Sequence, residues 1–478
     1  MKILFIQPNY DAHVVHPPLG LGYLASFLRI DKHNVAIFDG TLRNSSINDF
    51  LQEIENFNPD LLGISVLTRG HKKIKEMIRV IKSRFKVIPV VIGGTQVTAA
   101  PLEVMEDLSS DFAVIGEGEV TLRELVAAIG SRKNDFSKVD GLAYRNSKGK
   151  VIINKPRGLI ENLDSIPFPA WDLMVPEQYR IVPILEPAKA FPIAPILTTR
   201  GCPYNCSFCA SNVTWLRKLR FRSIGNVIAE IRMLKEKFGV REFHISDDNF
   251  TADINRAEQF CDALIAEKIN LSWQCPNGVR IDKLPPSLLR KMKKAGCYAV
   301  GLGIESGNQG ILKKNQKNLD LKIVSEVLKN LKKAGIESYG FFILGLPGDT
   351  KKTIDETIEF ALNYSFDRVW FNLFTPYPGS PAFDKWLGNR HFNMIDWDKH
   401  DCSTAVVKMA GISKKELEKL QRKALRRFYL RPKKLFELLS HLGPKEIKSL
   451  IMTRFFSKIL KPLFLIVHKA GRRSTIMV

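Results

Sequence analysis

Three cysteines are spaced closely enough to bind one metal centre. Cys202, Cys206 and Cys209 lie in the string RGCPYNCSFCA, and none of the other four cysteines lies within fifty residues of them. Thiolates are soft ligands that favour iron–sulfur clusters, zinc and copper(I). A structural zinc is normally closed by a fourth protein ligand, which this loop does not supply. The spacing therefore favours a 4Fe–4S cluster with one iron open to another ligand.

Other uses of these cysteines fit the sequence less well. A zinc ion would need a distant fourth ligand, which would be Cys261, Cys275, Cys297 or Cys402. A disulfide framework is not expected from seven cysteines, an odd and sparse count in a chain of 478 residues. A redox-active pair would normally use a C-x2-C string without a third cysteine.

The composition is typical of a globular protein with two to three domains. The chain is 25% charged and 45% hydrophobic, which suffices for substantial cores. The opening MKILFIQPNY is too short and too quickly polar for a signal peptide, and no stretch approaches the ~20 apolar residues of a membrane span. We therefore expect a cytoplasmic location, where a reducing environment suits an iron–sulfur cluster.

The first part of the chain alternates strand-like and helix-like segments. Strands are expected at 2–7, 35–39, 61–66, 87–94 and 112–118, and helices at 19–29, 47–56, 72–83 and 100–107. This alternation predicts an α/β domain over residues 1–135, with a parallel, doubly wound sheet and ligands at the carboxyl ends of its strands. A hairpin and then a proline-punctuated linker are expected over 136–192.

Strand–helix alternation resumes over residues 193–400. Strands are expected at 195–199, 241–246, 271–275, 298–304, 338–344 and 368–374, with helices at 223–238, 255–267, 286–294, 321–334 and 351–362. About six such units predict a partial (βα)6 barrel, with reactive loops at the carboxyl ends of the strands. Residues 401–478 are expected to form a basic helical extension. Its part from 411 to 478 holds 18 lysines and arginines against 4 glutamates, and so carries +14 of the net charge of +23.

The cysteine motif follows the first strand of this second domain, and Phe208 precedes its last cysteine. It resembles the signature of the radical S-adenosylmethionine (SAM) superfamily. The resemblance implies that Cys202, Cys206 and Cys209 bind three irons and that the amino and carboxylate groups of SAM bind the fourth. Reductive cleavage of SAM would then give a 5′-deoxyadenosyl radical, with an electron from a donor such as flavodoxin or ferredoxin.

Three later loops fit the same resemblance. ISDDN at 245–249, GIESG at 303–307 and GLPGD at 345–349 each follow a predicted strand. Each string alone is no more than a turn or a helix cap, but their order behind the cysteine motif is typical of the superfamily. By resemblance, Phe208, Asp247, Glu305 and Gly345 are predicted to contact SAM.

The first domain resembles the cobalamin-binding domains found in one group of radical SAM proteins. Ser65-Val66-Leu67, then 25 residues, then Gly93-Gly94 match the S-x-L…GG pattern, and PPLGLG at 17–22 and IGEGE at 115–119 also fit. The resemblance covers about residues 1–400. The group includes anaerobic magnesium-protoporphyrin IX monomethyl ester cyclase-like and hopanoid- or lipid-modifying enzymes. By resemblance, the predicted cobalamin contacts are Ser65, Leu67, Gly93, Gly94 and Glu117.

One loop departs from the pattern of cobalamin methyltransferases. Those proteins carry D-x-H-x-x-G, whose histidine ligates cobalt, whereas here Asp11 and His13 are followed by His16 in place of the glycine. Three alternatives stay open: His13 ligates cobalt, His13 is a loop residue without that role, or the domain is a scaffold without cobalamin. Methylthiotransferases are excluded as the family, because they bind a second cluster through N-terminal cysteines and residues 1–201 contain no cysteine.

The resemblance implies cobalamin-dependent methylation of an unactivated carbon. Radical cyclisation or rearrangement without methyl transfer is the alternative among enzymes, and a cofactor-sensing binding protein is the alternative outside them. We expect a hydrophobic substrate, such as a lipid, an isoprenoid or a tetrapyrrole, if the chain contacts a membrane.

The membrane hypothesis rests on apolar residues at helical spacing in the basic extension, beginning at Leu435, Phe436 and Leu438. Such segments can lie in a membrane interface and meet anionic headgroups. The alternative is that they pack on the barrel and present a solvated basic face. Nucleic acid is not expected as a partner, because no aromatic-rich RNA-binding motif accompanies the charge.

Overall fold

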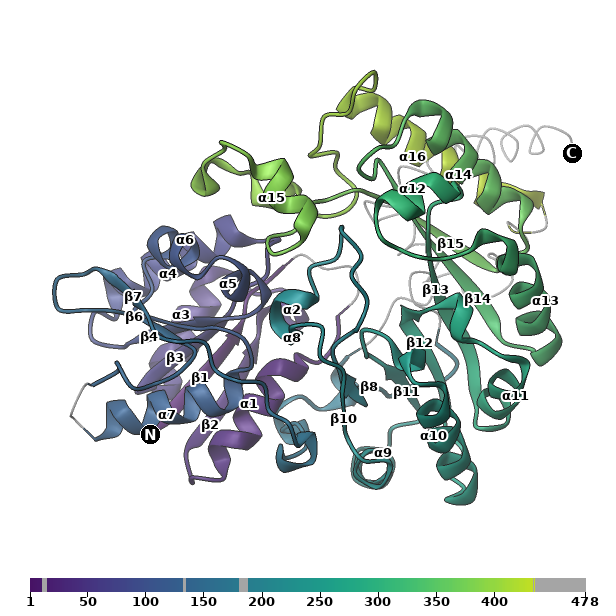
Figure 1. The fold of residues 1–478 in the computed structure, drawn as a ribbon. Helices are drawn as coiled ribbons and strands as arrows, with labels where there is room; N and C mark the ends of the chain where they lie inside the picture. The colour runs from purple at the N-terminus through teal and green to yellow at the C-terminus, as the bar shows by residue number, and fades with distance from the viewer. Residues whose placement is uncertain (11–14, 132–134, 180–187, 433, 435–478) are drawn as a thin grey trace, which may run out of the picture.

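The computed structural model describes residues 1–10, 15–131, 135–179, 188–432 and 434. Two α/β units lie side by side, the first coloured purple and blue and the second teal and green in Figure 1. Each contains one sheet with helices packed against it. The predicted fold class, a Rossmann-like domain followed by a partial barrel, is confirmed. His13 and residues 435–478, which include most of the predicted basic extension, lie outside the described residues.

The first unit is built on a seven-stranded sheet in the order β2-β1-β3-β4-β5-β6-β7. Its strands are β1 (Lys2–Gln7), β2 (Asn34–Asp39), β3 (Leu61–Ser65), β4 (Val90–Gly93), β5 (Phe112–Val114), β6 (Leu142–Arg145) and β7 (Val151–Ile153). The strands from β1 to β5 are parallel. Because the chain passes from β1 to β2 on one side and then to β3 on the other, a crevice is expected at the carboxyl ends of β1 and β3.

Helices cover both faces of this sheet. They are α1 (Leu19–Arg29), α2 (Gly40–Arg43), α3 (Ile47–Phe57), α4 (His71–Arg84), α5 (Thr95–Ala99), α6 (Pro101–Leu108) and α7 (Gly118–Gly130). α1 and α7 share one apolar cluster with the sheet, and α3, α4 and α6 share another. Enclosure between the two layers explains why Ile3, Leu4, Phe5 and Ile6 are all apolar and at most 1% exposed.

The sequence predicts the hairpin of β6 and β7 but does not place it in a sheet. β6 pairs antiparallel with β5, so the hairpin extends the first sheet. The physical reason is burial: Leu142 and Ala143 are fully buried in the cores on opposite faces of the sheet. A parallel sheet with an antiparallel hairpin at its edge is therefore the correct description.

The second unit is built on a six-stranded parallel sheet whose neighbours follow the order of the chain. Its strands are β8 (Ile193–Ile196), β11 (Glu242–Ile245), β12 (Ser272–Val279), β13 (Cys297–Glu305), β14 (Glu337–Leu344) and β15 (Arg368–Leu373). Its helices include α9 (Ile224–Phe238), α10 (Ile254–Ala266), α11 (Pro286–Lys294), α12 (Gln309–Lys314), α13 (Val324–Ala334) and α14 (Lys351–Asn363). β8 and β15 are the two edges, so the barrel is partial, as predicted.

Shorter elements connect the two units. β9 (Thr199–Arg200) and β10 (Arg220–Phe221) pair antiparallel, and α8 (Asn212–Trp215) lies between them in the chain. α8 packs against α5 of the first unit. α15 (Pro381–Leu387) and the residues after it extend over α4 and α6, which Figure 1 shows as green ribbon above the blue unit. The cysteine loop therefore lies where the two units meet.

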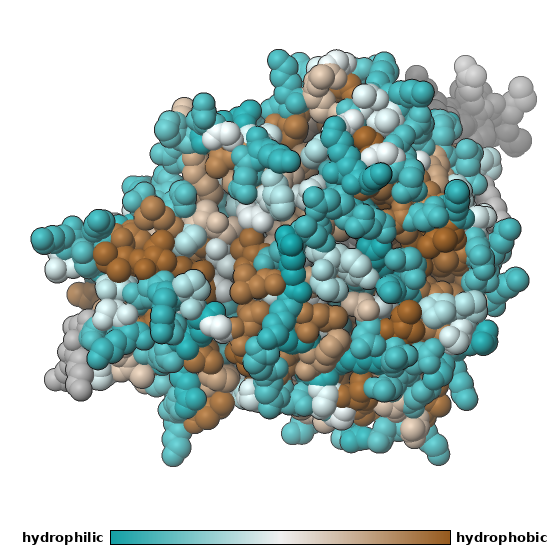
Figure 2. All heavy atoms as spheres, in the orientation of Figure 1, coloured by the Kyte–Doolittle hydropathy of each residue, from teal (hydrophilic) through white to brown (hydrophobic). Residues whose placement is uncertain are grey.

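α16 (Lys414–Tyr429) lies in the described part of the basic extension. Ser413 begins it by accepting a hydrogen bond from the Glu416 N–H, and its apolar face packs on β15. The phenol of Tyr429 donates to the Val369 carbonyl at 2.8 Å. Among the described residues, no helix is both long and apolar enough to cross a membrane. Figure 2 shows hydrophilic residues over much of one face, with smaller groups of hydrophobic residues between them.

Candidate active site

The three motif cysteines lie in one loop that follows β9. Cys206 is buried and the other two are partly exposed. Burial is the main reason that the pKa of Cys206 rises to about 11, and the nearby thiols of Cys202 and Cys209 raise it further. Among the described residues, no three His, Cys, Asp or Glu side chains converge as ligands of a single metal ion. A cluster binds one thiolate at each of three irons, so it does not require convergence at one point.

The shape of the loop is fixed by backbone geometry and by a second loop. Gly201 has φ +101°, and a Cβ there would lie 2.2 Å from the Lys218 carbonyl. The Ser207 N–H donates to the Asn315 carbonyl at 3.0 Å, and the Ser207 hydroxyl donates to the Asn315 side chain at 3.0 Å. The residues after α12 therefore hold the cysteine loop.

Asp247 is buried beneath the loop. Its carboxylate accepts hydrogen bonds from the Thr198 N–H at 2.6 Å, the Thr198 hydroxyl at 2.6 Å and the Thr199 N–H at 3.1 Å. Burial outweighs these bonds and raises the pKa of Asp247. Asp247, which is predicted to contact SAM, thus holds Thr198 and Thr199 in place, and these residues lead into the cysteine loop.

Glu305 ends β13 with φ +67° and forms an ion pair with Lys317, whose Nζ lies 3.0 Å from Oε1. Lys317 is 8% exposed, and its ammonium group lowers the pKa of Cys206 against the larger effect of burial. A left-handed backbone at a non-glycine residue is uncommon and is concentrated at functional sites. Lys317 is a site residue that the sequence analysis missed, since a lysine after a short helix has no distinguishing pattern.

Phe208 and Gly345 lie near the same end of the barrel. Phe208 packs against an apolar cluster formed by Ile311, Leu346, Phe374 and Ala382. Gly345 directly follows β14 with φ +91°, and its N–H donates to Asp349 at 3.0 Å. The structure thus places Phe208, Glu305 and Gly345 with the cysteines at the carboxyl end of the second sheet.

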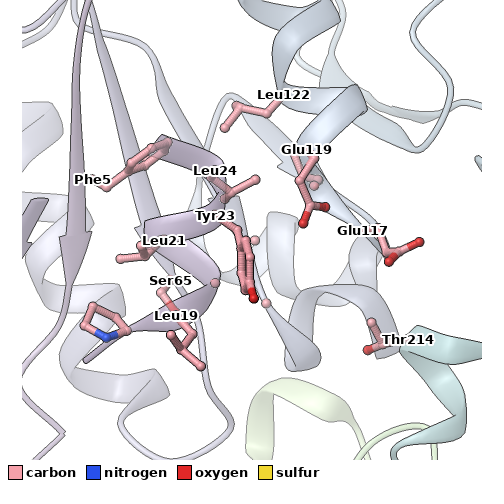
Figure 3. Close-up of a pocket in the computed structure, with 18 of the residues that line it drawn as sticks. Phe5, Leu19, Leu21, Tyr23, Leu24, Ser65, Glu117, Glu119, Leu122 and Thr214 are labelled. Carbon is pink, nitrogen blue, oxygen red and sulfur yellow. The ribbon is translucent and has the colours of Figure 1, made fainter. Parts of the chain in front are cut away.

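A cavity of about 430 Å³ lies at the carboxyl ends of β1, β3, β4 and β5. All five predicted cobalamin contacts line it, namely Ser65, Leu67, Gly93, Gly94 and Glu117. Figure 3 shows Leu19, Leu21, Tyr23 and Leu24 of α1 along one part of this pocket and Thr214 across from them. Arg200, Thr214 and Trp215 of the second unit also line the cavity, so it borders the cysteine loop.

Two loops of the first unit line the cavity, one after β3 and one after β4. The Tyr10 hydroxyl donates to the Ser65 carbonyl at 2.6 Å and accepts from the Leu67 N–H at 3.2 Å. Gly94 has φ +116°, and a Cβ there would lie 2.6 Å from the Val66 carbonyl. The S-x-L and GG strings are therefore in contact, which leaves backbone and small side chains facing the cavity. Such a lining suits a large, flat cofactor that needs close backbone approach.

Buried ion pairs join the cavity to the cysteine loop. Arg200, two residues before Cys202, donates to Glu117 and to Glu119, each at 2.6 Å. Arg220 donates to the other oxygen of Glu117 at 2.7 Å. Burial alone would raise the pKa of Glu117, but the two arginines outweigh it and hold the pKa below its ordinary value. Glu117 thus lines the cavity, and its carboxylate also connects the two units.

Comparisons with known proteins agree with this arrangement. Residues 196–361 match the radical SAM superfamily, and residues 10–126 match the B12 binding domain. An uncharacterized methyltransferase of Pyrococcus horikoshii is 33% identical over 451 residues, which cover 93% of this chain and 96% of the relative. The anaerobic magnesium-protoporphyrin IX monomethyl ester cyclase of Rubrivivax gelatinosus is 29% identical, with 90% and 78% covered.

Among solved structures, the methyltransferase TsrM of Kitasatospora setae, with cobalamin and a [4Fe-4S] cluster bound, superposes with a TM-score of 0.68. The similarity covers 93% of this chain and 89% of TsrM at 17% sequence identity. At that identity the similarity shows a shared fold.

Proposed function

The chain belongs to the radical SAM enzymes that carry a B12-binding domain, as its motifs predict, and we propose that it methylates an unactivated carbon of a hydrophobic small molecule. The observation that supports this most is the cavity that the S-x-L and GG loops share with Arg200, Thr214 and Trp215. When bound, a 4Fe–4S cluster with SAM supplies the one-electron chemistry and cobalamin supplies the methyl transfer. The protein's part is to hold these groups next to one another.

Each set of residues has a defined part in this proposal. Cys202, Cys206 and Cys209 are the cluster ligands. Glu305 and Lys317 form a buried pair beside Cys206 that can meet the charged groups of SAM. The apolar wall of α1 and the backbone of the two loops would hold cobalamin and exclude water from it.

Labelled methyl transfer tests the proposal. The full chain is reconstituted anaerobically with iron, sulfide and cobalamin, and is then reacted with a lipid extract and SAM labelled in its methyl group. A labelled product together with 5′-deoxyadenosine is expected, and Cys202→Ser should abolish both. Cys402→Ser is the control, because Cys402 lies outside the motif and should keep activity.

Cyclisation without methyl transfer is the second candidate, and it is favoured by the similarity to the Rubrivivax cyclase. In that case 5′-deoxyadenosine would form and a product would appear without the label. The same experiment therefore separates the two reactions.

We also propose a flavodoxin or ferredoxin as the electron donor. The chain carries a net charge of +23, which favours association with an acidic protein. Reduction by such a donor should slow as the salt concentration rises, whereas reduction by dithionite should depend on it less.

Peripheral membrane contact through the basic extension is proposed from the sequence. α16 packs into the second unit, so the test should remove only residues 435–478 and leave α16 intact. The full chain should sediment with anionic liposomes and the truncated chain should not. Equal sedimentation of the two proteins would contradict the proposal.

A further inference from the structure

A second cavity of about 430 Å³ lies outside the site described above, between α15 and the residues that follow it. Its wall contains the side chains of Trp386, Ile395, Ala405 and Val406, which are aromatic or aliphatic. Met394, which also lines it, is 79% exposed. The cavity thus offers apolar surface that is open to an incoming ligand.

One residue of the cavity wall has a buried polar side chain that lacks normal hydrogen bonds within the described part of the chain. His400 lines it and is 1% exposed. Neither ring nitrogen makes a hydrogen bond of normal geometry to the described residues, although the Asp396 backbone carbonyl lies near the ring. The imidazole is surrounded by the rings of Tyr377, Trp386 and Trp397. Unsatisfied buried polar groups are rare and often indicate a missing ligand or water.

Basic residues predominate among the charged residues of the cavity wall. Among the described residues, Arg390, Lys399 and Lys414 line the cavity, against a single acidic residue, Asp396, which forms an ion pair with Lys399 at 2.7 Å. The Arg390 guanidinium lies 5.0 Å from the centre of the Trp386 ring. Burial lowers the pKa of His400 to about 4, so at neutral pH its ring offers one donor and one acceptor. The charged residues that line the cavity therefore carry an excess of positive charge.

The cavity is connected to the carboxyl end of the barrel. The Tyr377 hydroxyl, in the loop after β15, donates to the His400 carbonyl at 3.1 Å. The N–H of Leu373, the last residue of β15, donates to the Cys402 carbonyl at 2.7 Å. The Ala382 N–H in α15 donates to the Ser207 carbonyl of the cysteine loop at 2.9 Å. A ligand held here would thus lie beside the elements that hold the cluster ligands.

We infer that this cavity, lined by Trp386, Arg390, Lys414 and His400, binds an organic anion with an apolar body. The carboxylate or phosphate of this anion contacts the basic residues of the wall, and its apolar body contacts the aromatic and aliphatic residues. We further infer that this anion is the charged end of the substrate. Only this second step rests on the proposed function, because binding itself does not depend on the reaction.

Binding is tested with the reconstituted full chain and three probes of equal length: dodecyl phosphate, dodecanoate and dodecanol. Calorimetry should show at least one of the two anions binding about tenfold or more tightly than the alcohol, because a hydrogen bond to a charged group is stronger than one between neutral groups. The comparison of the anions separates a phosphate site from a carboxylate site. Equal binding of all three probes would overturn the inference.

Matched substitutions locate the site. The double variant Arg390→Gln, Lys414→Gln should bind the anion about tenfold or more weakly and should bind dodecanol with unchanged affinity. Lys415→Gln is the control, because Lys415 is exposed and adjacent but does not line the cavity. In histidine-labelled protein, the anion should shift the ring nitrogen resonances of His400. Loss of affinity in the control, or unshifted His400 resonances, would contradict the assignment.

The outcomes keep the two proposals apart. Anion binding without a labelled methyl product would leave the cavity assignment standing and count against methylation. A labelled product from an uncharged substrate, with no anion binding, would overturn the inference and leave methylation standing.

Discussion

At the residue scale, the cysteine loop depends on side chains that are remote in sequence. Besides Asn315, the Gln316 side chain accepts a hydrogen bond from Asn205 at 2.9 Å. Arg280 donates to the carbonyls of Lys317 and Asn318, and its guanidinium lies 4.0 Å from the centre of the Tyr204 ring. The loop at 315–318 and Arg280 therefore support the loop of the three motif cysteines, which the cysteine spacing alone does not reveal.

Lys317→Met should weaken SAM binding more than cluster assembly. The substitution leaves the Glu305 carboxylate, whose side chain is 12% exposed, without its cation. An unpaired buried charge costs about 3–5 kcal/mol, so the loop that carries Glu305 should change conformation. Equilibrium dialysis of reconstituted protein should show a lower affinity for SAM, with the iron content little changed. The exposed Lys313→Met variant is the control, and equal affinity in both variants would contradict this role.

At the scale of elements, the strands were predictable because buried parallel strands are continuous apolar runs. LLGIS and VVIG, for example, lie between helical segments, and the observed β3 and β4 fall within the expected ranges. The sheet to which β6 and β7 belong was not predictable, because pairing with β5 is a long-range choice that local patterning does not encode. The ion pairs of Arg200 and Lys317 were not predictable for the same reason, because their partners lie 83 and 12 residues away.

Two adjacent glycines allow a test of the loops at the ends of β3 and β4. Gly94→Ala should disrupt cobalamin binding, because its Cβ would lie 2.6 Å from the Val66 carbonyl, at a φ of +116° that suits glycine. In Gly93→Ala the nearest atom would be a Val114 carbon at 3.8 Å, so this variant should fold normally. Titration with hydroxocobalamin, followed by absorbance, should show a greater loss of cobalamin affinity for Gly94→Ala. Equal binding by both variants would show that the close contact between the two loops is not needed for cobalamin binding.

At the scale of the whole molecule, one buried network of ion pairs joins the cysteine loop to the cavity of the first unit. Arg200 and Arg220 belong to the second unit, whereas Glu117 and Glu119 belong to the first, and all four side chains are at most 8% exposed. The same arginine that contacts both glutamates lies two residues before Cys202. The position of the cysteine loop and that of the cavity wall are therefore coupled through a rigid connection.

Arg200→Met should lower the free energy of unfolding by about 3–5 kcal/mol, because it leaves two buried carboxylates short of a partner. Arg123→Met is the matched control. Arg123 pairs with Asp31 at 2.7 Å, but the side chains are 44% and 33% exposed. Loss of such an exposed, solvent-screened pair should lower the free energy of unfolding far less than loss of the buried pairs. Urea denaturation measures the free energy of unfolding of both variants. A similar decrease in the two would contradict a dominant role for the buried network.

The same network predicts how stability depends on pH. The pKa of Glu117 is below its ordinary value of 4.5 in the folded protein, whereas the unfolded chain has the ordinary value. Its contribution is therefore complete above pH 4.5 and is lost as the pH falls through the lower, folded value. Glu117→Gln should be less stable than the natural protein at pH 7, and this difference should shrink in acid. Glu161→Gln, in an exposed pair with Lys218, should differ little from the natural protein at either pH. Urea denaturation from pH 7 down to pH 3 measures the difference in the free energy of unfolding, and a constant gap for Glu117→Gln over that range would show that the ion pairs do not set it.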